Sequence, residues 1–291
     1  MPTVEPKAQP KAQPKAQLYV VATPIGNLGD ITQRAIATLL QVDLVAAEDT
    51  RHSRTLLASQ QIDRPMIALH EHNEESMAPR LVERMLAGES IALISDAGTP
   101  LLSDPGYRLV RLAIDNGIRV TPLPGPSSIV TALSVAGIAT DRFVFEGFLP
   151  AKQAARLARL NALSNESRTL VFFESNHRIL DCLQDLSATM GPARQIAACR
   201  ELTKQFETIL RGSVEQVLQM VGADANQQKG EFVLVLAGAP ESADEKMSQA
   251  FSMARALQEY LSSSQAARVA AKLCGVQRRE LYEKLEDQAG E

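Results

Sequence analysis

The segment from Ile91 to Gly106 constrains the fold of this chain more than any other. The apolar run Ile91–Ile94 changes abruptly into small and acidic residues, and a helical pattern resumes at Tyr107. Such a run is typical of a buried parallel strand that opens into a loop. Ligands of open α/β sheets bind outside the carboxyl ends of the strands, so this loop, with Asp96 and Asp104, predicts a ligand site.

The same alternation of apolar runs and helical patterns extends to both sides of this segment. Asp30 is expected to cap the helix that follows the first strand. Strand–helix alternation of this kind builds a mostly parallel sheet. We expect strands at 18–22, 44–47, 66–69, 91–95 and 119–121, and helices at 30–40, 54–59, 73–87 and 107–116.

A proline-rich segment, 122–128, interrupts this alternation, and a second α/β unit begins at Phe143. Its strands are expected at 143–148, 169–173, 195–199, 208–210 and 231–237. The fold class is therefore α/β, with two α/β domains at 18–125 and 126–240 and a cleft between them. A small helical domain is expected at 241–291, and three Pro-Lys-Ala-Gln repeats predict a disordered tail at 1–17.

Composition narrows the function classes. The net charge of −4 excludes a globally basic nucleic-acid binder but allows a local basic patch. Three cysteines far apart in the sequence argue against a disulfide framework or a structural zinc site, and they fit a reducing cytosol. No apolar run approaches the roughly 18 residues that span a bilayer, and no secretory signal is expected at the N-terminus.

The loop 23–30 after the first strand contains Gly26 and Gly29, which resemble part of a nucleotide-binding loop. The full dinucleotide fingerprint and the P-loop motif are both missing, so these two classes are disfavoured. A glycine-containing turn with a helix cap explains the spacing as well as ligand contact does.

Polar residues also follow several other expected strands. They are Glu48, Asp49 and Arg51, then His70 and His72, then Glu174, and then Glu201 and Lys204, while Lys229, Gly230 and Glu231 lead into the last strand. Each group alone fits a solvated strand end as well as a site, but their recurrence favours one shared cleft. The His-x-His pair lacks further ligand spacing, so no metal is expected.

The C-terminal segment has the pattern of a helix-turn-helix. A serine cap precedes an alanine-rich helix, Gly275 ends that helix, and a second helix follows. Four basic residues, Arg268, Lys272, Arg278 and Arg279, form a candidate RNA-binding face. An ordinary helical cap with solvated charges fits the pattern nearly as well.

Seven motifs in order closely resemble the small-subunit ribosomal RNA methyltransferases of the tetrapyrrole methylase superfamily. They are residues 18–30 (LYVVATPIGNLGD), 47–52 (AEDTRH), 95–106 (SDAGTPLLSDPG), 122–128 (PLPGPSS), 146–150 (EGFLP), 200–204 (RELTK) and 229–231 (KGE). The resemblance implies a homodimer that binds S-adenosylmethionine, the methyl donor, between two α/β domains. It also implies methyl transfer to the ribose 2′-oxygen of a cytidine in the decoding region of 16S rRNA in the small ribosomal subunit.

For such a methyl transfer, the loops and strand ends supply the candidate site residues. The donor is expected to contact Pro24, Asp96, Ala97, Gly98, Thr99, Pro100, Pro126, Ser127, Ser128, Phe148, Leu149, Lys229 and Gly230. The candidates for substrate orientation or proton removal are Glu48, Asp49, Arg51, Glu174, Glu201 and Lys204.

Two other classes of protein stay open: a C-methyltransferase acting on a corrin or porphyrin precursor, and a non-catalytic RNA-binding protein. The tetrapyrrole enzymes differ in the first loop, typically with a G-x-G-D-P-like sequence.

Overall fold

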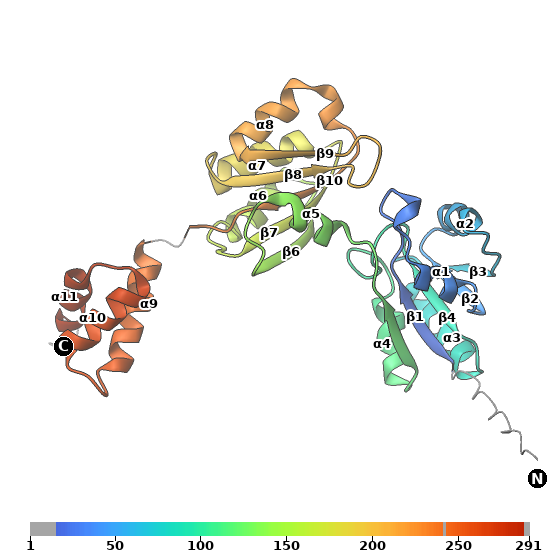
Figure 1. The fold of residues 1–291 in the computed structure, drawn as a ribbon, viewed down its shortest axis with the longest axis horizontal. Coiled ribbons are helices and arrows are strands. Elements are labelled where there is room, and N and C mark those ends of the chain that lie inside the picture. Colours follow the sequence, from blue (N-terminus) through green and yellow to red (C-terminus); the bar gives the residue numbers. More distant parts are fainter. Residues whose placement is uncertain (1–15, 241–242, 288–291) are drawn as a thin grey trace, which may run out of the picture. The chain divides into compact units, whose positions relative to one another are not determined.

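The computed structural model describes residues 16–240 and 243–287, which divide into two compact units (Figure 1). The first unit holds two five-stranded sheets. The second unit combines the helices after Gly238 with the segment 164–168. The predicted tail lies outside the described residues up to residue 15, and the first strand begins at Gln17.

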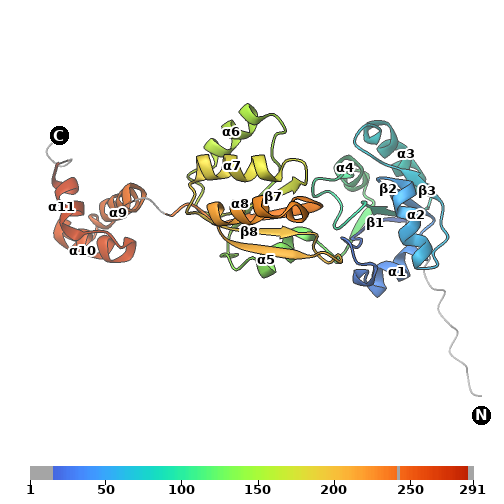
Figure 2. The same cartoon turned by 90° about the horizontal axis from the view of Figure 1, so that it is seen from above.

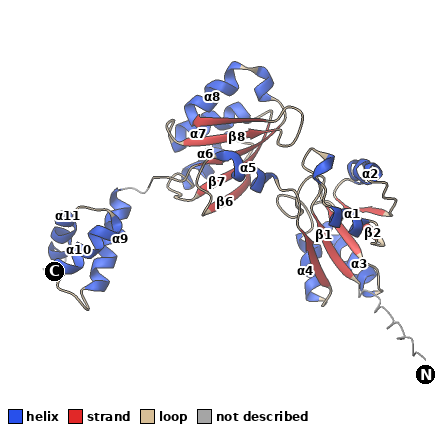
Figure 3. Cartoon of the chain, viewed as in Figure 1, coloured by secondary structure: helices blue, strands red, loops and turns tan. Residues whose placement is uncertain are grey.

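The first sheet is entirely parallel, with the order β3-β2-β4-β1-β5 (Figure 3). Its strands are β1 (Gln17–Val21), β2 (Leu44–Ala47), β3 (Met66–Ala68), β4 (Ile91–Ile94) and β5 (Arg119–Leu123). All four residues of β4 are buried because the strand is central and helices cover both faces of the sheet. The predicted parallel strand at the start of the key segment is confirmed.

Two helices pack on each face of this sheet. Helices α1 (Gln33–Leu39) and α2 (Thr50–Ser59) cover one face, and α3 (Glu74–Leu86) and α4 (Tyr107–Asp115) cover the other. The prediction that Asp30 caps a helix is wrong. Asp30 ends the short 3₁₀ turn η1 (Leu28–Asp30), and the hydroxyl of Thr32 caps α1 by accepting the N–H of Ala35 at 3.1 Å.

The second sheet has the order β6-β7-β10-β8-β9 and is mostly antiparallel. Only β6 and β7 run parallel. Strands β8 and β9 are joined by a short loop, which suits antiparallel neighbours, whereas a parallel pair needs a long crossover. The strands are β6 (Phe143–Phe148), β7 (Thr169–Ser175), β8 (Gln195–Arg200), β9 (Thr208–Ser213) and β10 (Glu231–Leu236).

Helices cover both faces of the second sheet as well (Figure 2). Helices α6 (Gln153–Ala162), α7 (Ile179–Met190) and α8 (Val214–Ala223) pack on one face. Helix α5 (Ser128–Ala136) packs on the other face, together with Ile25 from the first loop. Between α8 and β10 lies a 3₁₀ turn, η2 (Ala225–Gln228). This second face, which faces α5, is the one that bears the site.

The second unit is a small helical domain. Its helices are α9 (Ala243–Leu257), α10 (Ser263–Cys274) and α11 (Arg278–Asp287), and they share one apolar core. Gly275 ends α10 in the left-handed conformation at φ 67°, which a glycine adopts without strain. The predicted helical C-terminal region, with its turn at Gly275, is confirmed.

None of the helices within 16–240 and 243–287 is long and apolar enough to cross a membrane.

Candidate active site

A cavity of about 390 Å³ in the first unit is lined by residues from both sheets. From the first sheet come residues at the ends of β2 and β4, and from the second come residues of β6, β7, β8 and β10. The polar walls comprise Glu48, Asp96, Ser103, Asp104, Ser128, Ser175, Glu201, Lys204 and Glu231. The apolar walls include Ile25, Phe148, Phe173, Leu202, Phe232 and Val233. The site therefore combines an apolar floor with charged rims.

Two acidic residues meet because β2 and β4 are parallel neighbours whose last residues pair, Ala47 with Ile94. The backbone N–H of Asp96 donates to Oε2 of Glu48 at 3.4 Å. In the other direction, the backbone N–H of Asp49 donates to Oδ1 of Asp96 at 3.1 Å. Each strand end thus fixes the carboxylate that follows the other strand.

Asp104 completes an acidic wall with Glu48 and Asp96. Burial raises the pKa of Asp104 to about 6, and the charges of Glu48 and Asp96 add to this rise, although a hydrogen bond from Ser95 opposes it. Burial also raises the pKa of Glu48, against a backbone hydrogen bond from Asp96 that lowers it. Three carboxyl groups in one wall make the site strongly attractive to a cation.

The loop between β4 and α4 is held in an unusual path. Leu101 and Ser103 have left-handed backbones, with φ 75° and 70°. Gly98 exchanges backbone hydrogen bonds of 2.8 and 3.0 Å with Thr23 of the first loop. The buried carboxylate of Glu74 accepts the N–H of Gly106 at 3.1 Å, at the start of α4. Strained residues fixed this firmly are typical of functional loops.

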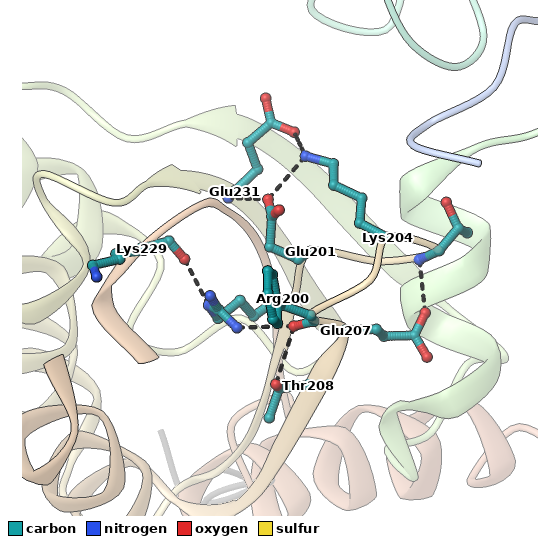
Figure 4. Close-up of polar contacts among 9 residues, drawn as sticks. Arg200, Glu201, Lys204, Glu207, Thr208, Lys229 and Glu231 are labelled. Atoms are coloured by element: carbon teal, nitrogen blue, oxygen red, sulfur yellow. Dashed lines mark hydrogen bonds and ion pairs between the residues drawn. The ribbon is translucent and has the colours of Figure 1, made fainter. Parts of the chain in front are cut away.

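On the side of the second sheet, Lys204 lies between two carboxylates (Figure 4). Its Nζ is 2.8 Å from Oε1 of Glu201 and 2.8 Å from Oε2 of Glu231. Burial alone would lower the pKa of Lys204, but the hydrogen bonds to the two glutamates raise it overall. Lys204 consequently holds its proton and is a fixed cation at the rim of the cavity.

Close packing surrounds this triad. Gly230 has φ 90°, and a Cβ added there would lie 2.5 Å from the carboxyl carbon of Glu201. A Cβ at Gly26 would overlap the Lys204 side chain, so the first loop lies directly on its aliphatic stem. The glycines predicted from the motifs therefore serve close approach of side chains at these two positions.

The structure separates the six candidate catalytic residues. Glu48, Glu201 and Lys204 line the cavity, as does Glu174. Asp49 and Arg51 lie outside its lining. The Asp49 carboxylate accepts the backbone N–H of Arg51 at the start of α2 and also pairs with the Arg51 guanidinium at 2.7 Å. These contacts hold the pKa of Asp49 well below its usual range.

The carboxylate of Glu174 lies on the opposite face of the second sheet. Side chains alternate along β7, and Phe173 packs on the face of α5 while Phe172 packs on the face of α7. Glu174 follows the second set: its fully buried carboxylate pairs with Arg178 at 2.7 Å. Burial, and then Glu174, raise the pKa of the Cys182 thiol in α7. The contacts of the Glu174 carboxylate are therefore with the helical layer around α7.

The residues expected to hold the donor fall into two groups. Asp96, Ala97, Ser128 and Phe148 line the cavity. The Thr99 hydroxyl donates to the carbonyl of Pro126 at 3.0 Å and so joins two of the loops that are expected to hold the donor. The others lie outside the lining: Pro24, Gly98, Pro100, Ser127, Leu149, Lys229 and Gly230.

Sequence reasoning missed several lining residues. Cys199 and Val233 belong to apolar strands and carry no polar signal. Asp104 lies in the loop after β4 that predicts a ligand site, but no specific role was predicted for it. Glu231 belongs to the 229–231 motif, but its contact with Lys204 was not predicted because only the strand order brings the two residues together.

In the second unit, the four predicted RNA-binding residues are all exposed. Arg268 and Lys272 lie one turn apart on α10. The Arg278 guanidinium donates to the Ser264 hydroxyl at 2.8 Å, and Arg279 pairs with Glu283 at 2.8 Å. The basic face is thus partly neutralised along α11 and more open along α10.

This two-sheet fold defines a class: the model of the Tetrapyrrole (Corrin/Porphyrin) Methylases matches residues 17–218. Uroporphyrin-III-C-methyltransferase from Thermus thermophilus is similar, with a TM-score of 0.55 and 19% identity over 76% of this chain and 94% of that one. Diphthine synthase has a TM-score of 0.58 and 14% identity over 76% and 90%. A further Thermus thermophilus uroporphyrin-III C-methyltransferase structure, complexed with S-adenyl homocysteine, has a TM-score of 0.53 and 17% identity, over 76% and 97%.

More similar relatives narrow the class. Ribosomal RNA small subunit methyltransferase I of Xylella fastidiosa is 51% identical over 91% of this chain and 97% of its own length. The Haemophilus influenzae protein of the same name is 52% identical over 91% and 95%. Residues 250–288 match the RsmI C-terminal HTH domain. The chain therefore belongs to the ribosomal RNA small subunit methyltransferase I family.

Proposed function

We propose that this protein transfers a methyl group from S-adenosylmethionine to ribosomal RNA of the small subunit. The finer assignment is the ribose 2′-oxygen of a cytidine in the decoding region of 16S rRNA. The observation that carries the proposal is identity of about half of all residues, over nearly full length, to enzymes named for methylation of small-subunit ribosomal RNA. The cavity and its charges give this family assignment a chemical basis.

The residues of the cavity suit the donor. S-adenosylmethionine carries a sulfonium cation, which the wall of Glu48, Asp96 and Asp104 would attract. Its adenine would pack on apolar residues such as Phe148 and Ile25. The volume of about 390 Å³ lies within the range of small-molecule sites. The donor supplies an activated methyl group, and the protein's task is alignment.

The ribose hydroxyl is a weak nucleophile until its proton leaves, so a proton acceptor assists the transfer. Among the candidates in the cavity, we assign this role to the carboxylate of Glu48, because its raised pKa favours proton uptake. Lys204 keeps its own proton and would orient the substrate as a cation. The other carboxylates of the wall, Asp96 and Asp104, would hold the donor.

RNA binding is assigned to the second unit. Arg268 and Lys272 are exposed on α10, where phosphates can reach them. The homodimer expected from the resemblance stays a prediction, which sedimentation of the purified protein would test.

The test is direct. Purified protein and labelled S-adenosylmethionine are incubated with small ribosomal subunits from a strain that lacks the homologous enzyme, and methylated nucleosides are mapped by mass spectrometry. Label on one decoding-region cytidine 2′-oxygen is the expected result. Label on a base or on another nucleotide would overturn the finer assignment. Donor binding without any RNA label would favour a tetrapyrrole substrate.

A further inference from the structure

The loop between β8 and β9, residues 201–207, has a backbone that ordinary loops avoid. Glu201 and Thr203 are left-handed, with φ 50° and 67°, although neither is glycine. Such conformations persist only where the surrounding structure fixes them. Because Glu201, Leu202 and Lys204 line the cavity, this strain lies at the rim of the active site.

Contacts fix the loop along its whole length (Figure 4). The buried Arg200 guanidinium donates to the carbonyl of Phe206 at 2.8 Å, and Thr208 adds a 3.2 Å hydrogen bond to the same oxygen. The N–H of Thr203 donates to Oε2 of Glu207 at 2.7 Å. These hydrogen bonds hold the start and the end of the loop in place.

The loop 201–207 carries an apolar side chain, Phe206, that is exposed. Two hydrogen bonds hold the carbonyl of Phe206, yet the residue is 64% exposed. A phenylalanine exposed to this extent gains little from burial in the isolated chain. It lies two residues beyond Lys204, which lines the cavity.

We propose that the ring of Phe206 stacks on an unpaired base of the RNA substrate, next to the nucleotide that is methylated. This inference rests on the proposed RNA substrate. Single-stranded RNA is recognised largely by aromatic side chains that stack on splayed bases. A phenylalanine ring has only two side-chain torsions, so it provides such a platform at low entropic cost.

The first test measures kinetics with small ribosomal subunits as substrate. Phe206→Ala is expected to raise KM for the subunits by about 5- to 150-fold, which is the fold-change that corresponds to the loss of one base–aromatic stack. The affinity of Phe206→Ala for S-adenosylmethionine is expected to equal that of the parent. Phe206→Trp is expected to keep the KM of the parent. The matched control is Phe143→Ala, since Phe143 is 42% exposed at the other end of β6 from the cavity residue Phe148.

The second test reads stacking itself. The chain contains no tryptophan, so Phe206→Trp creates a single fluorescent reporter. Titration with transcribed, protein-free 16S ribosomal RNA is expected to quench this emission, and the control Phe143→Trp is expected to stay unquenched. Unchanged emission of the Phe206→Trp variant at RNA concentrations that saturate filter binding would overturn the proposal.

Two further outcomes would also overturn it. A change of sedimentation in Phe206→Ala would assign the ring to a contact between two copies of this chain. An unchanged KM in Phe206→Ala would show that no base stacks there. Because every arm compares variants with an active parent, failure of the RNA assignment itself would appear separately, as a parent that labels no RNA.

Discussion

The backbone N–H of Asp49 and Oδ1 of Asp96 form a 3.1 Å hydrogen bond that joins the ends of β2 and β4. This hydrogen bond fixes the Asp96 carboxylate, which we propose binds the methyl donor. Asp96→Asn keeps an oxygen for this bond but removes the charge. We expect donor affinity to fall about tenfold in calorimetric titration, while thermal stability changes little, because one charge near a cation is lost.

Asp96→Ala removes the acceptor as well, and it should also lower the free energy of unfolding by roughly 1 kcal/mol. If Asp96→Ala bound the donor as well as the parent, the assignment of this residue would be wrong.

The raised pKa of Asp104 predicts that protein stability and donor affinity change with pH in opposite directions. Its pKa is raised to about 6 in the folded protein, so the folded state takes up this proton more readily than the unfolded chain. The contribution of Asp104 to stability is therefore fully present below the ordinary pKa of 3.8 and is lost as pH rises through 6. Donor affinity should rise across the same interval, because the ionised carboxylate attracts the sulfonium.

Asp104→Asn tests both trends at once. Between pH 5 and 7.5, calorimetric titrations of the variant should show weaker donor binding than those of the parent. Donor affinity and melting temperature should also both change less with pH in the variant. If donor affinity and stability kept their full pH dependence in the variant, a group other than Asp104 would be the one that titrates.

Gly230 and Gly117 form a matched pair for the packing of the lysine triad. Both have left-handed backbones, at φ 90° and 69°, but a Cβ at Gly230 meets the Glu201 carboxylate, whereas nothing lies within 4 Å of one at Gly117. Alanine at Gly117 should cost about 1 kcal/mol in chemical denaturation, from backbone strain alone. Gly230→Ala should cost more and should reduce methyl transfer, since Glu201 and Lys204 must move. Equal effects of the two variants on activity would contradict this arrangement.

Sequence patterns predicted the first sheet better than the second for a physical reason. A parallel strand buried on both faces reads as an unbroken apolar run, as β4 does. In β7 the neighbouring Phe172 and Phe173 hide the alternation, so the sequence could not show that the Glu174 carboxylate lies away from the cavity. The contact of Lys204 with Glu231 depends on β10 pairing with β8, and strand order leaves no local signal in the sequence.

The basic face of α10 makes the last prediction. Arg268 and Lys272 are exposed on successive turns, whereas Arg279 is paired with Glu283 at 2.8 Å. Each phosphate contact adds about 0.7 to 0.9 to the slope of log affinity against log salt. Arg268→Gln with Lys272→Gln should therefore lower that slope by about 1.4 to 1.8 in filter binding to 16S ribosomal RNA and leave donor affinity unchanged. Arg279→Gln, the matched control, should change the slope less, because Glu283 already neutralises this guanidinium. An equal loss in the control, or no loss in the double variant, would show that the phosphates bind elsewhere.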